Sequence, residues 1–164
     1  KAAEEQIMSA YKNANACVSI VRHAPGTDLR THGKYRWLAG VADGQAGSNT
    51  LIECKSRHVA ANDSDLQQYM PQVQGLLEVW DMPTCDLVVH SLNDETVRVH
   101  EVRRDEKYFK WMEPILRHFA MLSFQITAKY APPPSMLQSS TSSPPPYVTI
   151  TLKSDFKLKL VLDA

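Results

Sequence analysis

The sequence has few of the residues that build metal fingers, disulfide scaffolds or membrane spans. Its 164 residues include three cysteines, and they form neither a CxxC pair nor a cluster with a His-x3-His spacing, which argues against a zinc site and a secreted disulfide framework. No run of about 18 apolar residues occurs, so no membrane-spanning helix is predicted. A signal peptide pattern is also absent, and we expect an intracellular protein in a compartment that the sequence does not specify.

An excess of charge of one sign is lacking too. Lysine and arginine number 18, as do aspartate and glutamate, so the formal net charge is zero. A free-standing DNA-binding protein is usually basic, and the balance therefore disfavours tight nonspecific binding to nucleic acid. It is compatible with an enzyme that combines acidic metal ligands with a local basic rim. The length is sufficient for one domain with a hydrophobic core.

The most informative stretch spans residues 37–57, and it predicts two short strands joined by a hairpin. Glycine, serine and asparagine residues at 44–49 separate two apolar-rich runs, which is typical of a hairpin turn. Because side chains alternate along a strand, Glu53 and Lys55 share one face of the second strand. An acidic and a basic side chain in an otherwise apolar strand are costly unless they are paired or used in function.

Acidic side chains of this hairpin predict a metal site. Asp43 follows the first strand, and across the hairpin its carboxylate can lie close to that of Glu53. Two neighbouring carboxylates repel each other, and a divalent cation relieves that repulsion. Oxygen ligands suit Mg²⁺, which keeps several waters and takes one or two carboxylates together with a substrate phosphate. Lys55 would then lie beside a metal-bound water or the scissile phosphate.

The same residues carry a resemblance to a known family. Asp43, followed ten residues later by Glu53-Cys54-Lys55, resembles the core motif of the PD-(D/E)XK nucleases. The surrounding text, AGVADG and then LIECK, is similar to the branch that holds phage lambda exonuclease and the YqaJ-type viral recombinase nucleases. The motif alone is short, but further matches follow in the order that the family shows.

Three other passages match this branch. Glu4, preferred over Glu5, stands seven residues before Tyr11, and the resemblance implies that a glutamate at this place on the first helix adds to the metal site. Another matching passage, from Arg104 to Tyr108, is structural rather than catalytic. The basic residues around it fit DNA contact and a solvated helix start equally well. The helix after the second strand carries a Y-x-x-Q-x-Q signature, matched by Tyr69, Gln72 and Gln74.

The resemblance also implies roles for these helix residues. Gln72 would lie at the metal centre and position the water or a phosphate oxygen, and Tyr69 and Gln74 would bind substrate. A glutamine amide both donates and accepts hydrogen bonds, which suits a bridge between Lys55 and a phosphate. Without the resemblance, Gln72 would be interpreted as a surface residue and Glu4 as a favourable charge at a helix start.

The fold implied by the resemblance is a restriction-endonuclease-like core of the α/β (α+β) class, a central mixed β-sheet flanked by helices. The implied activity is a metal-dependent deoxyribonuclease. Asp43, Glu53 and the carbonyl of Cys54 would hold Mg²⁺, for which Mn²⁺ can substitute, and Lys55 would orient and help deprotonate the attacking water. By family analogy, the enzyme is a 5′–3′ exonuclease on linear double-stranded DNA in recombination or repair. Implied partners are DNA, further copies of the chain and a single-strand annealing protein.

Two alternatives stay open at this point. One is a noncatalytic nucleic-acid-binding module that kept the fold, although the complete set of Asp, Glu, Lys and Gln disfavours a decayed site. The other is an endonuclease or an RNA-acting enzyme with the same core, because fold alone does not decide the substrate.

Periodicity and composition predict the remaining organisation. Residues 1–130 are assigned to the nuclease core, the Pro/Ser-rich residues 131–146 to a linker, and the alternating residues 147–164 to a hairpin-like extension of unknown role. His90 and His100 are interpreted as satisfied strand histidines rather than metal ligands. One helix is expected over 2–16 and another over 106–126, with Asp105 as the N-cap of the second. A further helix is expected to begin near Pro71, after an irregular lead-in from Asp65. Strands are expected over 17–21, 35–41, 85–90 and 96–102.

Overall fold

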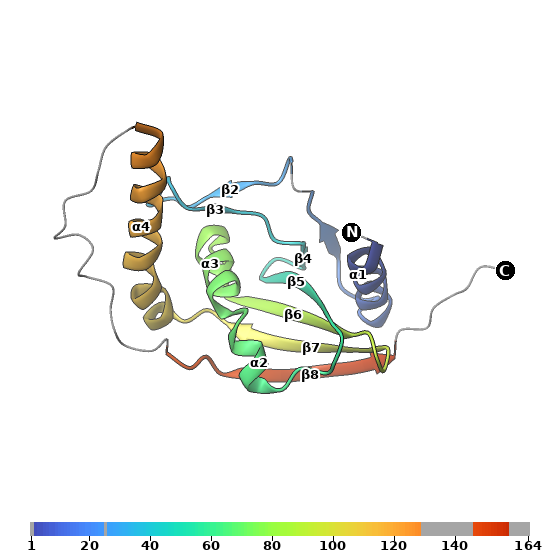
Figure 1. Ribbon diagram of the computed structural model, residues 1–164. Coiled ribbons are helices and arrows are strands. Elements are labelled where there is room, and N and C mark those ends of the chain that lie inside the picture. Colours follow the sequence, from blue (N-terminus) through green and yellow to red (C-terminus); the bar gives the residue numbers. More distant parts are fainter. Residues whose placement is uncertain (1, 25, 129–145, 158–164) are drawn as a thin grey trace.

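The chain folds around one β-sheet. The structure is a computed structural model that describes residues 2–24, 26–128 and 146–157. Figure 1 shows the sheet together with its four helices, and the core contacts place α1 on one face and α2, α3 and α4 on the other. The helices α1, α2, α3 and α4 span Ala2–Ala14, Asp63–Gln67, Met70–Trp80 and Glu106–Ala128.

The sheet has six strands in the order β1-β4-β5-β6-β7-β8. β5 and β6 are parallel, and every other neighbouring pair is antiparallel. A parallel pair needs a crossover connection, which contains α2 and α3. The expected mixed sheet flanked by helices is therefore confirmed. The strands β1, β4, β5, β6, β7 and β8 span Ile20–Arg22, Gly44–Ala46, Thr50–Arg57, Thr84–Ser91, Thr96–Arg103 and Ile150–Lys157.

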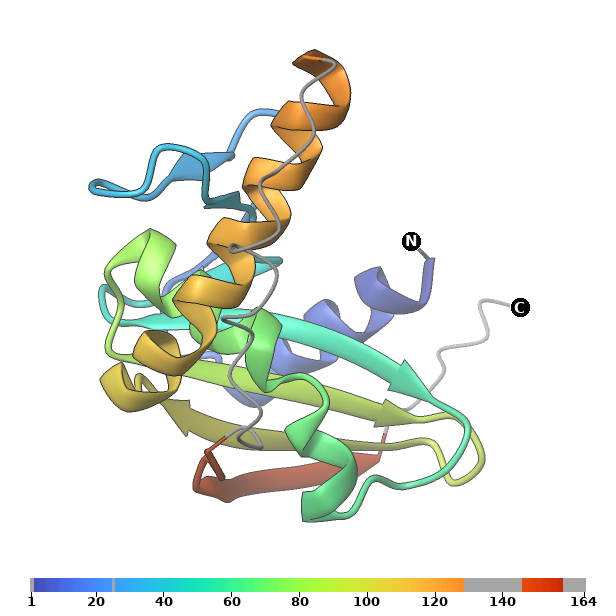
Figure 2. The same ribbon diagram turned by 60° about the vertical axis from the view of Figure 1, so that its left-hand side comes forward.

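Each face of the sheet carries its own hydrophobic core, because side chains alternate along a strand. On β5, Leu51 packs in the core beneath α3 and α4, whereas Ile52 and Cys54 pack in the core beneath α1. Figure 2 shows the two sets of helices separated by the strands. The alternation directs Glu53 and Lys55 to the α3 face.

The local sequence fixes where the helices begin. Asn62 caps α2 and forms a capping box with Asp65, so the lead-in that was expected to be irregular is a short helix. Pro71 lies in the first turn of α3, where its missing N–H costs no helical hydrogen bond. Asp105 accepts hydrogen bonds from two backbone N–H groups in the first turn of α4, at 2.8 and 3.2 Å, which confirms the predicted N-cap.

The prediction of a strand over residues 35–41 is wrong. Only Ala39–Gly40 is extended, as β3, and it pairs with β2 (Arg30–Thr31) in a separate two-stranded sheet. Tyr35 packs against the core beneath α3 and α4, and its carbonyl accepts the Leu38 N–H at 2.8 Å in a turn. Tertiary packing of this aromatic side chain therefore overrides the apolar strand pattern.

The hairpin that carries the acidic residues is formed by β4 and β5 instead. Its turn contains Gly47 at a φ of 60°, a left-handed conformation that favours glycine. Gly44 pairs with Ile52 across the hairpin. Asp43, which directly precedes β4, consequently lies opposite Glu53. The first strand of the sheet also begins later than the predicted residue 17, at Ile20.

The chain's last described segment completes the sheet. Residues 150–157 form one continuous strand antiparallel to β7. Pairing with β7 keeps the chain extended where the hairpin was expected to turn, so no terminal hairpin forms within the described residues. Nearly all of the predicted linker at 131–146, and residues 158–164, lie outside the described residues. In the described part of the chain, no helix is long and apolar enough to cross a membrane.

Candidate active site

Three polar side chains meet on the α3 face of β5. Glu53 and Lys55 project from the strand, and Gln72 projects from the first turn of α3. The Lys55 ammonium donates to Glu53 Oε1 at 2.7 Å and to Gln72 Oε1 at 2.8 Å. The Gln72 amide in turn donates to Glu53 Oε1 at 2.5 Å. The structure thus joins these three candidate catalytic residues in a closed ring of hydrogen bonds, which we name the catalytic ring after their predicted roles.

Asp43 lies beside the catalytic ring. Its Oδ2 accepts the backbone N–H of Cys54 at 2.7 Å, which fixes the carboxylate against the stretch of β5 that carries Glu53. Asp43, directly before β4, and Glu53, on β5, therefore lie at the same level of the sheet.

Burial makes these two carboxylates poor anions on their own. Glu53 is only 3% exposed. Burial first, and then the charge of Asp43, raise its pKa to about 7 against the opposing effect of Lys55. Burial also raises the pKa of Asp43, where the Cys54 N–H works in the opposite direction and the charge of Glu4 in the same one. The site is therefore short of positive charge.

The donor set fits a hard divalent cation. Glu53 Oε2 is buried and has no hydrogen-bond partner among the described residues, and a buried acceptor without a partner is costly. No three His, Cys, Asp or Glu side chains in the described part of the chain form a ready metal cluster. Two carboxylates with water and phosphate completing the shell are the ligand set that suits Mg²⁺ rather than a dedicated protein cage.

Glu4 approaches the same region from α1. Its carboxylate lies 3.6 Å from the Arg22 guanidinium, which also lies 3.4 Å from Glu5. The charge of Glu4 acts on Asp43 and on the Cys54 thiol, whose pKa burial already raises. Among the two glutamates, Glu4 is therefore the one with an electrostatic link to the site, and Arg22 is a neighbour that the sequence did not single out.

The side chains of Tyr69 and Cys54 differ in their position relative to the catalytic ring. The Tyr69 ring lies 5.7 Å from the Lys55 ammonium, close enough for a cation–π contact. The Cys54 side chain is buried on the opposite face of β5, in the core beneath α1. Its thiol therefore points away from the catalytic ring, and only its backbone is available to the site.

The structure does not bring Gln74 to the site. This side chain is fully buried, with no exposed surface. Its amide donates to the Arg103 carbonyl at 2.9 Å and its oxygen accepts the Asp105 N–H at 2.8 Å. Gln74 therefore ties α3 to the junction between β7 and α4, and its amide is not available to a substrate.

Arg104 is likewise structural. Its guanidinium donates twice to Glu78, at 2.9 and 2.7 Å, and once to Asp81 at 2.6 Å. These contacts fasten the end of α3 to the start of α4, as expected for a structural match to the family passage. The bidentate pairing leaves this arginine committed to carboxylates.

A second buried polar group was missed by sequence reasoning. Asp86 on β6 is fully buried and accepts from the Tyr11 hydroxyl at 2.5 Å and from the Lys153 ammonium at 2.8 Å. This cluster links α1, β6 and β8 on the face away from the catalytic ring. The available signal was an aspartate within the apolar run Cys-Asp-Leu-Val-Val, since a buried charge requires partners.

The two strand histidines lie on β6 and β7, outside the hydrogen bonds that form the catalytic ring. His90 and His100 are each 5% exposed. Neither nitrogen of His90 has a hydrogen-bond partner among the described residues, so this histidine is buried without being satisfied, contrary to its interpretation from the sequence.

Comparison with known proteins identifies relatives only at the level of structure. No family model and no curated protein matches the sequence. The crystal structure of an alkaline exonuclease, LHK-Exo, from Laribacter hongkongensis is similar to this chain with a TM-score of 0.53 and 16% identity, over 78% of this chain and 72% of that one. The structure of LHK-Exo in complex with dAMP matches with the same TM-score and 17% identity, over 78% and 71% of the two chains. The chain therefore has the fold of an alkaline exonuclease, as its resemblance to the lambda exonuclease branch predicted.

Proposed function

We propose that this protein is a metal-dependent deoxyribonuclease. The observation that carries the proposal is the catalytic ring of Glu53, Lys55 and Gln72 with Asp43 beside it, on a fold shared with an alkaline exonuclease. A buried carboxylate that shares hydrogen bonds with an amine and an amide is costly in a structural core. They are the groups needed to hold a cation, a water and a phosphate next to one another.

The metal would be Mg²⁺, with Mn²⁺ as a substitute. Asp43, Glu53 and the Cys54 carbonyl would hold it, with Glu4 as an additional acidic group. Bound there, the ion would supply charge stabilisation for the phosphoryl group and a more acidic water. The buried, unpartnered Glu53 Oε2 and the raised pKa values of both carboxyl groups support this assignment.

The protein's own groups would position the reactants. Lys55 carries its charge between Glu53 Oε1 and Gln72 Oε1, and in this place its ammonium orients the attacking water and attracts the scissile phosphate. Gln72 has both a donor and an acceptor, so it holds the Lys55 side chain with its oxygen and Glu53 with its nitrogen. Tyr69 limits the movement of the Lys55 side chain from the other side.

The proposed substrate is linear double-stranded DNA, degraded from 5′ to 3′ inside the cell during recombination or repair. Support comes from the fold of LHK-Exo, which is named an alkaline exonuclease and which was also crystallised with dAMP. A homo-oligomer and a single-strand annealing protein are the proposed partners. A noncatalytic binding module and an endonuclease or RNA-acting enzyme are the competing functions.

One substrate panel separates these functions. Linear, nicked and circular DNA and an RNA of the same length are incubated with Mg²⁺ and the protein, its Lys55→Ala variant or its Lys12→Ala variant. Lys12 is an exposed lysine on α1, so its variant controls for loss of one surface charge.

A 5′–3′ exonuclease degrades linear duplex only, releases label from the 5′ end first, and loses activity in Lys55→Ala but not in Lys12→Ala. Cutting of circular DNA would instead assign an endonuclease, and degradation of RNA alone an RNA-acting enzyme. Absence of cleavage by the unmodified protein, with DNA binding retained, would assign the binding module and refute the proposal.

A further inference from the structure

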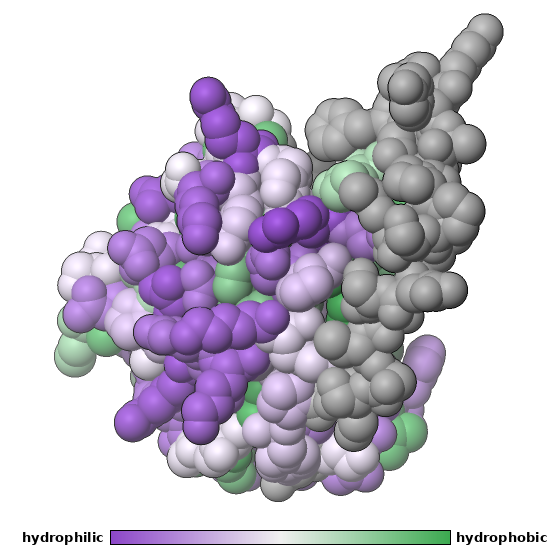
Figure 3. Space-filling view, turned by 90° about the vertical axis from the view of Figure 1, so that its left-hand side faces the viewer, coloured by the Kyte–Doolittle hydropathy of each residue, from purple (hydrophilic) through white to green (hydrophobic). Residues whose placement is uncertain are grey.

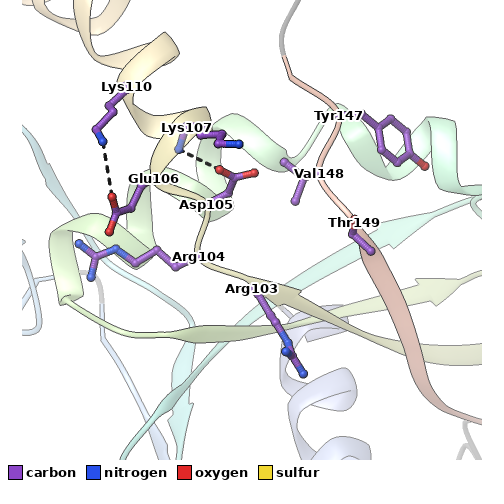
Figure 4. Close-up of a pocket in the computed structure, with 9 residues that line it drawn as sticks. All are labelled: Arg103, Arg104, Asp105, Glu106, Lys107, Lys110, Tyr147, Val148 and Thr149. Atoms are coloured by element: carbon purple, nitrogen blue, oxygen red, sulfur yellow. Dashed lines mark hydrogen bonds and ion pairs between the residues drawn. The ribbon is translucent and has the colours of Figure 1, made fainter.

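A cavity separate from the catalytic ring opens between the start of α4 and the segment that leads into β8. Its volume is about 480 Å³. Figure 4 shows its lining side chains, which come from the end of β7, the start of α4 and the segment that leads into β8. Figure 3 looks onto the side of the molecule where α4 lies, and the side chains that it colours there are mainly hydrophilic. The cavity combines an aromatic ring with several cations, and each component has a definite structural support.

The aromatic component is Tyr147. Its side chain is among the exposed large hydrophobic groups, at 66% exposure. The backbone that follows it is clamped, because the Gln67 amide donates to the Val148 carbonyl at 2.7 Å and its oxygen accepts the Val148 N–H at 3.1 Å. The Val148 side chain is buried in the core beneath α3 and α4. The structure therefore presents an exposed ring on a fixed backbone.

Two lysines are the cations of the cavity that remain available to a ligand. Four cationic and two anionic side chains line it, but Arg103 is paired with Glu101, and Arg104 with Glu78 and Asp81. Among the ion pairs of the described residues, none involves the Lys107 ammonium, and Figure 4 shows this side chain extending toward Val148. Lys110 is paired with Glu106 at 3.5 Å with both side chains highly exposed. An exposed pair of this kind is weak, so Lys110 can exchange Glu106 for a phosphate.

We propose that this cavity is a binding site for single-stranded nucleic acid, with a base stacked on Tyr147 and the adjoining phosphates on Lys107 and Lys110. An exposed aromatic face takes an unpaired base of any sequence, and lysines that track the backbone supply the rest of the affinity. A base in a duplex is already stacked and paired, so its face is not available to the ring.

The position of the cavity connects it with the proposed cleavage site. Gln67, which clamps the backbone next to Tyr147, lies two residues before Tyr69, whose ring contacts Lys55. One short stretch of chain therefore supports both the cavity and the catalytic ring. The inference rests on the proposed nuclease function only in assigning the bound strand as part of the substrate, a single-stranded portion that flanks the cleaved bond.

Binding without cleavage tests the site. The affinity of a fluorescent (dT)12 oligonucleotide is measured by anisotropy in EDTA, for the unmodified protein and for the Tyr147→Ala, Tyr147→Phe, Lys107→Gln and Lys12→Gln variants. Tyr147→Ala is expected to weaken binding roughly 10-fold, because base stacking on an aromatic ring is lost. Tyr147→Phe keeps the ring and should bind as the unmodified protein does.

The salt dependence identifies the phosphate contact. Lys107→Gln should reduce the slope of log affinity against log salt by about 0.7, the contribution of one phosphate on a single strand. Lys12→Gln removes the same charge from α1, on the other face of the sheet, and should leave the slope unchanged. A duplex of the same length should bind equally well to the unmodified protein and to Tyr147→Ala.

Equal binding of (dT)12 by Tyr147→Ala and the unmodified protein, or equal changes in slope for the two lysine variants, would overturn the inference. These outcomes are distinct from failure of the proposed function. DNA cleavage with Tyr147-independent binding refutes the cavity alone, whereas Tyr147-dependent binding without any cleavage supports the cavity and refutes the nuclease.

Discussion

Replacing Glu53 by glutamine is expected to stabilise the metal-free protein, and this stabilisation is expected to grow as the pH rises from 5 to 8. Glu53 is buried beside Asp43, and burial with this neighbouring charge raises its pKa from 4.5 to about 7. The folded protein therefore holds the Glu53 proton more tightly than the unfolded chain does. The stability that this group contributes is present below pH 4.5 and is lost as the pH rises through 7.

The size of the effect follows from the shift. One pKa unit corresponds to about 1.4 kcal/mol, so a rise of this size makes ionised Glu53 cost about 3 kcal/mol of unfolding free energy above pH 7. Glutamine has nearly the same shape and no ionisation, so Glu53→Gln avoids this cost. Because the unfolded chain is already largely ionised at pH 5, the difference in stability between the variant and the unmodified protein should grow by about 2–3 kcal/mol between pH 5 and pH 8.

Urea unfolding in EDTA at several pH values measures this difference. Any change that glutamine makes in packing is independent of pH and cancels when the two ends of the range are compared. Glu106→Gln, at a highly exposed glutamate of α4, is the control and should give a difference that stays flat. A flat difference for Glu53→Gln, or one that shrinks with rising pH, would refute the argument that this carboxyl is ionised at a cost.

Two other predictions concern the glutamines of α3 and the buried Asp86. Gln74→Leu should lower the unfolding free energy by about 2–4 kcal/mol in urea, because it removes the hydrogen-bond partners of the part-buried Arg103 carbonyl and Asp105 N–H. Gln72→Leu should instead reduce DNA cleavage with little loss of stability. The reverse pattern would return Gln74 to the active site. Lys153→Met should lower the unfolding free energy by about 2 kcal/mol in thermal or urea unfolding at pH 7, because it removes the ammonium from fully buried Asp86. This pair is less costly to break than a wholly buried one, since Lys153 is half exposed. Unchanged stability would show that the ion pair with Lys153 does not stabilise the fold.

The hairpin chemistry could be predicted from the sequence because it depends on local spacing. Alternation along β5 fixes the shared face of Glu53 and Lys55 whatever the rest of the chain does. The tight β4–β5 turn then brings Asp43 to the level of Glu53. The predicted strand over 35–41 failed, because packing against α4 decides the conformation of Tyr35, and this contact lies far away in the sequence.

The roles of the two glutamines could have been separated by helix geometry. Residues two apart on a helix point to different sides, so Gln72 and Gln74 cannot both face the catalytic ring. The family resemblance placed both in the active site, Gln72 at the metal centre and Gln74 at the substrate. Contacts of Asp86 were beyond local reasoning, since its partners Tyr11 and Lys153 are 75 and 67 residues away.

A titration with Mn²⁺ tests the central claim most directly, because it reads the cation site without any substrate. Binding is measured by calorimetry for the unmodified protein and for Asp43→Asn, Glu53→Gln and, as the control, the exposed Asp94→Asn. The account predicts uptake of Mn²⁺ by the unmodified protein and by Asp94→Asn, and a loss of affinity of at least roughly 10-fold in each of the other two variants. Equal uptake by all four proteins, or none by any of them, would contradict it.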